Sequence, residues 1–305
     1  MKLNHIYQGD VINRLKDLPD RSIQCVVTSP PYWGLRNYQM EGQLGLEETP
    51  ELYVENMVNV FREIKRVIKD DGTLWLNLGD SYAGGGKGNY GSGISTHNGT
   101  VSKHPKGSDF KTPNLKTKDL VGIPWRVAFA LQADGWYLRQ DIIWHKPNPM
   151  PESVKDRCTK SHEYIFLLTK SAKYFYDADA LREPADTKPH KMGGTQTSSD
   201  RNDGDRQDVV IGDGFRNKRS VWKITTKPYK EAHFAVFPPK IPELCIKAGS
   251  KEGDIVLDPF FGSGTTGWVA QRLGRKWIGI ELNAEYIKIA EKRFLQRELF
   301  TGEIK

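Results

Sequence analysis

Short runs of apolar residues, either alternating with polar ones or continuous, predict β-strands separated by amphipathic helices along much of the chain. Residues 6–29 predict strand, helix and strand, because an amphipathic segment lies between an extended piece and the β-rich run SIQCVVTS. Thr49-Pro50-Glu51 opens a long helix whose apolar residues recur at three- and four-residue spacing until Asp71-Gly72 ends it. A buried strand is predicted from Thr73 to Gly79.

The same alternation continues through the rest of the chain. A helix is predicted over Ile123–Ala133, followed by two strands in WYLRQDIIWHK and HEYIFLLTK. The last fifty residues predict a strand, a glycine-rich turn, a helix, a second strand and a closing helix capped by Asn283. Repeated units of this kind predict an α/β fold, in which a mostly parallel sheet is covered by helices on both faces.

Two polar stretches interrupt this pattern. Residues 83–120 predict a basic, flexible insertion and residues 182–220 a polar insertion, both within a single domain over 1–305. The simplest interpretation is that both stretches are solvated loops. The functional alternative is that they are a pair of basic arms that neutralise phosphates and recognise DNA. Their basic residues include Lys87, Lys103, Lys106, Lys111, Lys116, Lys118, Lys188, Lys191, Arg201, Arg206, Arg216, Lys218 and Arg219.

Composition narrows the choice of partner and compartment. Lys and Arg outnumber Asp and Glu by 45 to 38, and the resulting net charge of +7 favours a polyanionic partner. The sequence contains no apolar run of membrane-spanning length and no signal-peptide pattern at its start, so we expect a cytoplasmic protein. Three cysteines without CxxC spacing suggest neither a disulfide framework nor a zinc site, and no other metal cluster is expected.

A glycine-rich turn near the end of the chain is the first motif that indicates chemistry. Its glycines allow a sharp strand-to-helix turn and close approach of a ligand, while Asp258 would repel phosphate and attract an ammonium group. Glu281, 19 residues after Gly262, ends the next strand, where a carboxylate can accept ribose hydroxyls. An amino-acid-bearing nucleoside without phosphates, S-adenosylmethionine, fits this set. The candidate residues in the turn are Asp258, Phe260, Gly262, Gly264, Thr265 and Thr266.

The second motif follows a buried strand near the start of the chain. Ser29-Pro30-Pro31-Tyr32 lies at the carboxyl edge of the predicted sheet, where open α/β folds bind ligands. The two prolines fix the backbone and leave the Ser29 hydroxyl and the Pro30 carbonyl as acceptors beside an aromatic ring. Such a loop would hold an amino group on a flat ring. The alternative is a proline-stiffened turn with Tyr32 capping the core.

Together the two motifs resemble the S-adenosylmethionine-dependent DNA methyltransferases that modify exocyclic amino groups. That family has Asp, Asn or Ser before Pro-Pro and an aromatic residue, and its cofactor turn is D-P-F-x-G-S-G-T-T. The catalytic loop precedes the cofactor turn, which resembles the permuted β-type members. The resemblance implies a Rossmann-like methyltransferase fold, circularly permuted, with a mostly parallel seven-stranded sheet.

The resemblance also assigns residues outside the two motifs. Asp10 matches the acid that meets the adenine amino group, although a helix N-cap is the alternative. His233 resembles the segment that covers the methionine end of the cofactor, but the surrounding residues depart from the family pattern. Trp144–Asn148 is similar to the target-side loop, with a hairpin carrying a core tryptophan as the alternative.

The expected function is methylation of cytosine N4 in double-stranded DNA, with the target base flipped out. Ser29 is shorter than the Asp or Asn that the family also uses, which suits the smaller pyrimidine. N6-adenine methylation is the nearest alternative, followed by methylation of RNA or a protein amide, or DNA binding without catalysis. A cognate restriction endonuclease is a possible partner, and the oligomeric state stays open.

Overall fold

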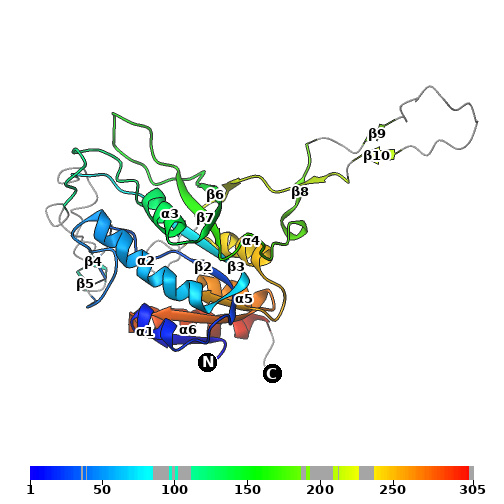
Figure 1. Cartoon of the computed structure of the whole chain (residues 1–305), viewed down its shortest axis with the longest axis horizontal. Coiled ribbons are helices and arrows are strands. Elements are labelled where there is room, and N and C mark those ends of the chain that lie inside the picture. The colour runs from blue at the N-terminus through cyan, green and yellow to red at the C-terminus, as the bar shows by residue number, and fades with distance from the viewer. Residues whose placement is uncertain are drawn as a thin grey trace, which may run out of the picture.

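The computed structural model describes a chain built around one eight-stranded sheet, in the order β1-β14-β13-β2-β3-β7-β6-β12 (Figure 1). The residues described are 1–84 without 36 and 39, 96–97, 100–101, 111–186, 190–192, 209–211, 213–226 and 237–301. The strands of the sheet are β1 (His5–Gln8), β2 (Ile23–Thr28), β3 (Ile68–Leu78), β6 (Tyr137–His145), β7 (His162–Thr169), β12 (Val221–Lys223), β13 (Ile255–Asp258) and β14 (Lys276–Glu281).

The sheet is mostly parallel, as the sequence predicts. All its pairings are parallel except those of β7, which runs antiparallel to both β3 and β6. The predicted strands form seven of the eight members, and the three-residue edge strand β12 is the addition. The permutation is visible in the strand order, because β1 at the start of the chain pairs with β14 near its end.

Helices cover both faces of the sheet, with a separate apolar core under each. On one face α1, α2 and α3 pack against β2 and β3, and Figure 1 shows α2 and α3 side by side. On the other face α4 packs against β2 and β3, α5 packs against β13 and β14, and the first part of α6 packs against β1 and β14. The helices are α1 (Val11–Lys16), α2 (Pro50–Val67), α3 (Ile123–Ala133), α4 (Lys240–Gly249), α5 (Thr265–Arg272) and α6 (Ala284–Thr301), with a 3₁₀ turn at Asp179–Leu181.

One predicted boundary is wrong. The helix α2 ends at Val67 rather than at Asp71-Gly72, and Ile68 already has extended backbone angles and begins β3. Ile68 pairs with Ile23 whereas Thr73 pairs with Cys25, so the intervening residues form an irregularity in the strand. The apolar residues Val67 and Ile68 continue the helical spacing, which is why the sequence pattern could not separate the two elements.

One helix and one strand of the main α/β layers have no counterpart in the prediction. The helix α4 begins in a proline-rich stretch, yet Pro239 and Pro242 lie at its cap and first turn, where no intrahelical N–H bond is lost. The edge strand β12 is only three residues long and pairs with β6 through Ile143, Trp144 and His145. Both elements place buried side chains in the second core.

The two polar insertions contribute short hairpins outside the main sheet. The pairs are β4 (Thr96–His97) with β5 (Thr100–Val101), β8 (Glu183–Pro184) with β11 (Phe215–Arg216), and β9 (His190–Met192) with β10 (Val209–Ile211). In Figure 1 the β9–β10 hairpin extends away from the sheet. Much of both insertions lies outside the described residues, so their predicted flexibility stays a prediction.

The parallel strands end at one edge of the sheet, which is where the two sequence motifs meet. Thr28 is followed by the Ser29–Tyr32 loop, and Asp258 by the glycine-rich turn. Glu281 is the last residue of β14, and Asp10 lies two residues after the end of β1. Because neighbouring parallel strands present their carboxyl ends side by side, segments far apart in sequence form one site.

Candidate active site

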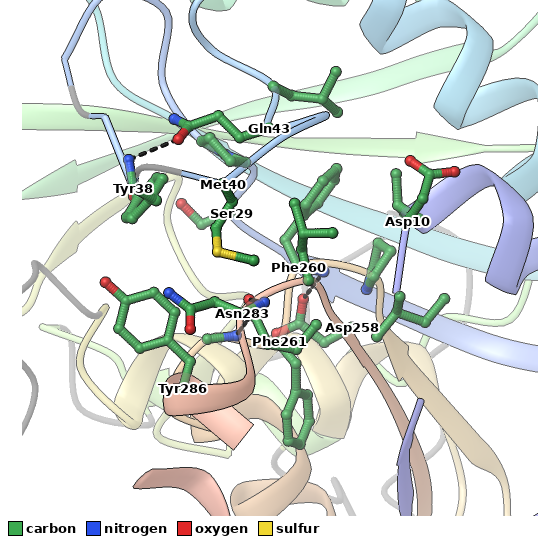
Figure 2. A pocket seen from close by; sticks show the side chains of 18 of the residues that line it. Asp10, Ser29, Tyr38, Met40, Gln43, Asp258, Phe260, Phe261, Asn283 and Tyr286 are labelled. Carbon is green, nitrogen blue, oxygen red and sulfur yellow. Dashed lines mark hydrogen bonds between the residues drawn. The ribbon is translucent and has the colours of Figure 1, made fainter. Parts of the chain in front are cut away.

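A cavity of about 180 Å³ lies at this carboxyl edge, between the loops that follow β1, β2, β13 and β14 (Figure 2). In Figure 2 Asp10 lies at one side of the cavity, Tyr38 and Tyr286 lie at the other, and Asp258 and Phe260 lie between them. The predicted site residues that line the cavity are Asp10, Ser29, Pro31, Asp258, Phe260, Gly262, Thr265 and Glu281. Thus both motifs contribute to one cavity.

The glycine-rich turn takes backbone angles that favour glycine. Gly262 and Gly264 have φ values of 50° and 76°, in the left-handed region that side chains rarely occupy. A Cβ on Gly262 would meet no atom within 4 Å, so the backbone is open to the cavity there. Gly264 instead caps α5 and packs against Phe261 and Ala290, at 3.1 Å from its notional Cβ. Gly262 therefore offers close approach to a ligand, and Gly264 shapes the turn.

Asp258 is buried and almost fully hydrogen bonded within the protein. Its Oδ1 accepts from the Thr28 hydroxyl at 2.7 Å and from the Phe260 amide at 3.1 Å, and its Oδ2 accepts from the Thr266 hydroxyl at 2.7 Å. A carboxylate offers about four acceptor positions, so roughly one remains for a ligand. Burial raises the pKa of this carboxyl to about 7, although the three hydrogen bonds oppose the shift. Asp258 joins the two motifs as well as lining the cavity.

Glu281 ties the glycine-rich turn to the end of β14. Its Oε2 accepts from the Gly262 amide and its Oε1 from the Asn283 amide, both at 2.8 Å. Burial raises the pKa of Glu281 above its ordinary value. Each carboxylate oxygen has two acceptor positions, so Glu281 can also accept hydroxyl groups of a ligand.

Asp10 is the N-cap of α1 and also lines the cavity, so its predicted contact with the adenine amino group stays a prediction. Its side chain caps α1 by accepting from the Asn13 amide at 3.0 Å, and the same residue lines the cavity. The N-cap interaction fixes the carboxylate at the cavity wall. Asp10 can therefore also accept from a ligand amino group.

The Ser29–Tyr32 loop lies partly on the cavity wall and partly beside it. Ser29 and Pro31 line the cavity, and the Pro31 carbonyl accepts from the Tyr53 hydroxyl at 2.9 Å. Pro30, between them in the sequence, is buried. Tyr32 is outside the lining. Its hydroxyl is 2.7 Å from Glu163 Oε2, and its ring lies against Gly79, where a Cβ would come within 2.5 Å.

Several predicted residues fall outside the cavity wall. Gly264 and Thr266 lie behind it, since one shapes the turn and the other bonds Asp258. His233 lies outside the described residues, so its predicted contact with the methionine end stays a prediction.

The sequence analysis missed cavity residues after the Ser29–Tyr32 loop, before α4, within the glycine-rich turn and around the start of α6. Tyr38 and Tyr286 approach edge to face, with ring centroids 6.0 Å apart, and the Tyr38 amide donates to Gln43 Oε1 at 2.6 Å. Their segments carry neither a motif nor a periodicity that indicates a site. Only the fold brings them together. The further lining residues include Met40, Leu44, Phe237, Phe261, Ser263 and Asn283.

The Trp144–Asn148 segment shows the core tryptophan of the second alternative, while its role as the target-side loop stays a prediction. Trp144 is a core residue, 4% exposed, whose ring nitrogen donates to the Ile224 carbonyl at 2.8 Å. Lys146 lies over the Trp144 ring at 4.3 Å and forms an ion pair with Glu163. The segment thus reaches the loop of Ser29 and Tyr32 through Glu163.

The described basic residues of the two insertions are largely engaged with acidic partners. Lys111 pairs with Glu48 and Lys118 with Asp156, and Glu183 pairs with a group of three cations. That group is Arg216, Lys218 and Arg219. The pairs of Lys111 and Lys118 are exposed, so each contributes little stability. Lys87, Lys103, Lys106, Lys188, Arg201 and Arg206 lie outside the described residues.

The described part of the chain lacks both a membrane-spanning helix and a metal-binding cluster. None of the described helices has the length and apolar character needed to cross a bilayer. Within the same residues, no cluster of three or more His, Cys, Asp and Glu side chains is arranged to hold a metal ion.

The chain is similar in sequence to a known protein family and to several known proteins. Residues 23–292 match the model of a family described as DNA methylase. The type II methyltransferase M.XycI of Xanthomonas campestris pv. cyanopsidis is 50% identical over 292 residues, covering 94% of this chain and 86% of that protein. M.SmaI of Serratia marcescens is 49% identical over 294 residues, covering 96% and 91% respectively.

Solved structures share the fold. The PvuII DNA methyltransferase, described as cytosine-N4-specific, aligns with a TM-score of 0.64 at 22% identity, covering 95% of this chain and 85% of that one. A putative DNA modification methylase from Thermus thermophilus, solved with S-adenosyl-L-methionine, aligns with a TM-score of 0.61 at 22% identity, covering 96% and 93%. With the family match over most of its length, the permuted α/β sheet and the two motifs around one cavity, this chain belongs to the DNA methylase family and is a DNA methyltransferase.

Proposed function

We propose that this protein transfers a methyl group from S-adenosylmethionine to the exocyclic N4 of a cytosine in double-stranded DNA. The observation that carries the proposal is that Ser29 and the Asp258–Gly262 turn line one cavity. Thr28 and Asp258 hold these two segments together through a 2.7 Å hydrogen bond. A methyl donor and an amino acceptor bound by these segments would therefore be neighbours.

The residues present fit S-adenosylmethionine. Gly262 leaves open space for close approach, and the carboxylates of Asp10, Asp258 and Glu281 surround the same cavity. Acidic acceptors suit the adenine amino group, the ammonium group and the ribose hydroxyls, whereas they would repel a phosphate. Aromatic surface for the purine ring comes from Tyr38, Phe260 and Tyr286. The cofactor supplies an electrophilic methyl group on a sulfonium.

The Ser29–Tyr32 loop supplies the acceptors that the target amine needs. The lone pair of a cytosine amino group is delocalised into the ring, which makes the nitrogen a poor nucleophile. Hydrogen bonds from the amine to Ser29 Oγ and to the Pro30 carbonyl localise that lone pair. With the cofactor held by the glycine-rich turn, an N–CH₃ bond would form as the S–CH₃ bond breaks with its electron pair on sulfur, and the nitrogen would release one proton to solvent. Positioning provides most of the rate.

The preference for cytosine rests on Ser29 and on one relative's description. Serine carries its hydroxyl on a single carbon, so it draws the amine closer to the backbone than Asp or Asn would. The PvuII enzyme, which shares the fold, is described as cytosine-N4-specific. N6-adenine methylation is the second candidate, since the family description covers DNA methylases in general.

Access to the amine requires the target base to leave the duplex, at a cost of roughly a few kcal/mol. Stacking on Tyr32 would offset part of this cost, by about 1–3 kcal/mol. The basic insertions would hold the DNA backbone. The named relatives are type II methyltransferases, which supports a cognate restriction endonuclease as a functional partner.

Nucleoside mass spectrometry of plasmid DNA methylated by the purified protein tests the proposal directly. We expect N4-methylcytosine that is absent without the protein, and long-read sequencing of the same DNA then maps the recognition site. A Ser29→Ala variant should bind cofactor normally and lose on the order of 10²-fold in single-turnover rate, as for other lost transition-state contacts. N6-methyladenine without N4-methylcytosine would refute cytosine as the target.

A further inference from the structure

A chain of hydrogen bonds runs from Ser29, at the cavity wall, to a largely buried carboxylate behind it. The Ser29 hydroxyl lies 3.2 Å from the Tyr32 hydroxyl, which lies 2.7 Å from Glu163 Oε2. The other oxygen of Glu163 forms an ion pair with Lys146. The Glu163 and Lys146 side chains are only 15% and 20% exposed, so water screens this group weakly.

The direction of this chain follows from the partners of Tyr32. Its hydroxyl faces the Glu163 carboxylate and, at 3.2 Å, Asn77 Oδ1. The Asn77 amide is oriented unambiguously, because its Nδ2 donates to the Tyr164 carbonyl at 3.0 Å, an atom that can only accept. Tyr32 therefore faces two acceptors and directs its single proton toward them.

Ser29 is left with one role. Since the Tyr32 proton is committed to Glu163 and Asn77, the Tyr32 oxygen can only accept from Ser29. The Ser29 hydroxyl proton consequently points away from the cavity, toward Tyr32, and the lone pairs of Oγ are left for a ligand. A reversed chain would aim the Ser29 proton at the target amine, which also presents protons.

Three strands converge to build this arrangement. Glu163 is the second residue of β7, the strand that runs antiparallel to its neighbours, so its first residues lie at the carboxyl edge of β3 and β6. Asn77 comes from the end of β3, and Lys146 follows β6. Asn77 Nδ2 also donates to Glu163 Oε2 at 3.1 Å, so both Lys146 and Asn77 require Glu163 to accept.

We propose that Glu163 is a positioning residue which, acting through Tyr32, keeps the Ser29 hydroxyl oriented as an acceptor for the target amine. This inference rests on the proposed function. Glu163 touches neither cofactor nor base. Its effect is confined to the orientation of two hydroxyl protons, so it acts on the methyl-transfer step and leaves cofactor binding and base flipping unaffected.

Glu163→Gln tests this with almost no change in side-chain shape. Glutamine has a single side-chain oxygen, and Lys146 requires it, so the amide group faces Tyr32. The Tyr32 proton then goes to Asn77 Oδ1, and the amide N–H donates to the Tyr32 oxygen in place of Ser29. The Ser29 hydroxyl proton is thereby released from Tyr32 and can point into the cavity. On a duplex carrying the mapped site, we expect the single-turnover rate to fall at least tenfold. Cofactor affinity, and the fluorescence of a base analogue next to the target that reports flipping, should stay within twofold.

A double-mutant cycle separates this role from a general structural one. Tyr32→Phe keeps the ring but removes the link between Glu163 and Ser29, so it should lower the rate similarly with flipping retained. Adding Glu163→Gln to Tyr32→Phe should then change the rate by less than twofold. Rate losses that multiply would overturn the proposal, as would a wild-type rate in either single variant. Tyr32→Phe also decides the matter if Glu163→Gln fails to fold.

Glu63→Gln is the matched control. Glu63 lies on α2, is 25% exposed and pairs with Arg66 at 2.9 Å, so the same chemical change is made in a comparable ion pair away from the sheet edge. We expect its rate to match the wild type. A wild-type protein that makes no N4-methylcytosine on this duplex contradicts the proposed function, whereas an active wild type with an equally active Glu163→Gln contradicts only this inference.

Discussion

The Thr28 hydroxyl donates a 2.7 Å hydrogen bond to Asp258 Oδ1, a residue 230 positions further along the chain. Thr28 directly precedes Ser29, and Asp258 begins the glycine-rich turn, so this bond fixes the Ser29–Tyr32 loop relative to the candidate cofactor site. Both residues are almost completely buried. A change in the distance between Thr28 and Asp258 would therefore displace both the Ser29–Tyr32 loop and the glycine-rich turn.

Thr28→Val should weaken both the fold and cofactor binding. The change keeps the side-chain volume but removes one donor to the buried carboxyl, at a cost of about 1–3 kcal/mol in unfolding free energy. Urea unfolding and calorimetry with S-adenosylmethionine measure the two effects. Thr73→Val is the control. Thr73 lies on β3, the strand next to that of Thr28, and is equally buried, and its hydroxyl accepts from the Trp75 ring nitrogen at 3.1 Å. Thr73→Val should lower the free energy of unfolding without changing cofactor affinity. Equal losses of cofactor affinity in both variants would contradict the view that Thr28 positions the cofactor site.

The raised pKa of Asp258, about 7, predicts a pH dependence of stability. The unfolded carboxyl titrates near pH ~4 and the folded one near pH 7, so between these values the folded state binds more protons. Stability should therefore fall as pH rises through this window, by about 1.4 kcal/mol per pH unit, and level off above it. Asp258→Asn removes this contribution. Urea unfolding between about pH 4 and pH 7 should show the free energy of unfolding of the wild type falling relative to that of the variant by this slope. A difference between the two proteins that does not change with pH would contradict the titration of buried Asp258.

Glu281→Gln should weaken cofactor binding without unfolding the protein. Glutamine can still accept from one of the amides of Gly262 and Asn283, but it loses the charge that strengthens hydrogen bonds from ribose hydroxyls. A loss of roughly 1.5–3 kcal/mol, or about ten- to a hundredfold in Kd, is expected for a hydrogen bond to a charged group. Glu285→Gln, an exposed position four residues on that pairs with Lys288, should leave calorimetric affinity unchanged.

Changing Lys103, Lys106, Lys111 and Lys116 to glutamine should weaken DNA binding and flatten its salt dependence. Each lost phosphate contact reduces the slope of log K against log salt concentration by about 0.9. Fluorescence anisotropy at several salt concentrations measures this slope. Lys240→Gln with Lys247→Gln, which removes two cations that pair with Glu243 on α4, serves as the control. An unaltered slope in the quadruple variant would show that the first insertion is a spacer.

The fold could be predicted from sequence because its signals are local. The turn at Gly262 and Gly264, the strand before it and the cap at Asn283 each depend on a few adjacent residues, and all are present. The end of α2 was misplaced because Val67 and Ile68 satisfy helical and strand patterns equally. Local signals do not separate two elements that share apolar residues at their junction.

The candidate site was predictable where motifs define it and obscure where tertiary packing does. Asp10, Ser29 and Glu281 end or closely follow strands, so strand order alone brings them to one edge. Tyr38 and Tyr286 meet only because the segment after the catalytic loop crosses to α6. Glu163 was recognisable in principle, as an acid at the start of an otherwise apolar strand, but its partner Tyr32 could not be inferred without the position of β7 between β3 and β6.

The pairing of β1 with β14 has a consequence for how the protein is made. His5–Gln8 hydrogen bonds to Ile278–Glu281, so the strand that leads to Asp10 leaves the ribosome long before its partner exists. During synthesis the β2–β3 region can pair early, whereas the Asp10 side of the cavity waits for the final strand. The cavity is therefore complete only after β14 has been translated, and β1 is open to mispairing for that whole interval.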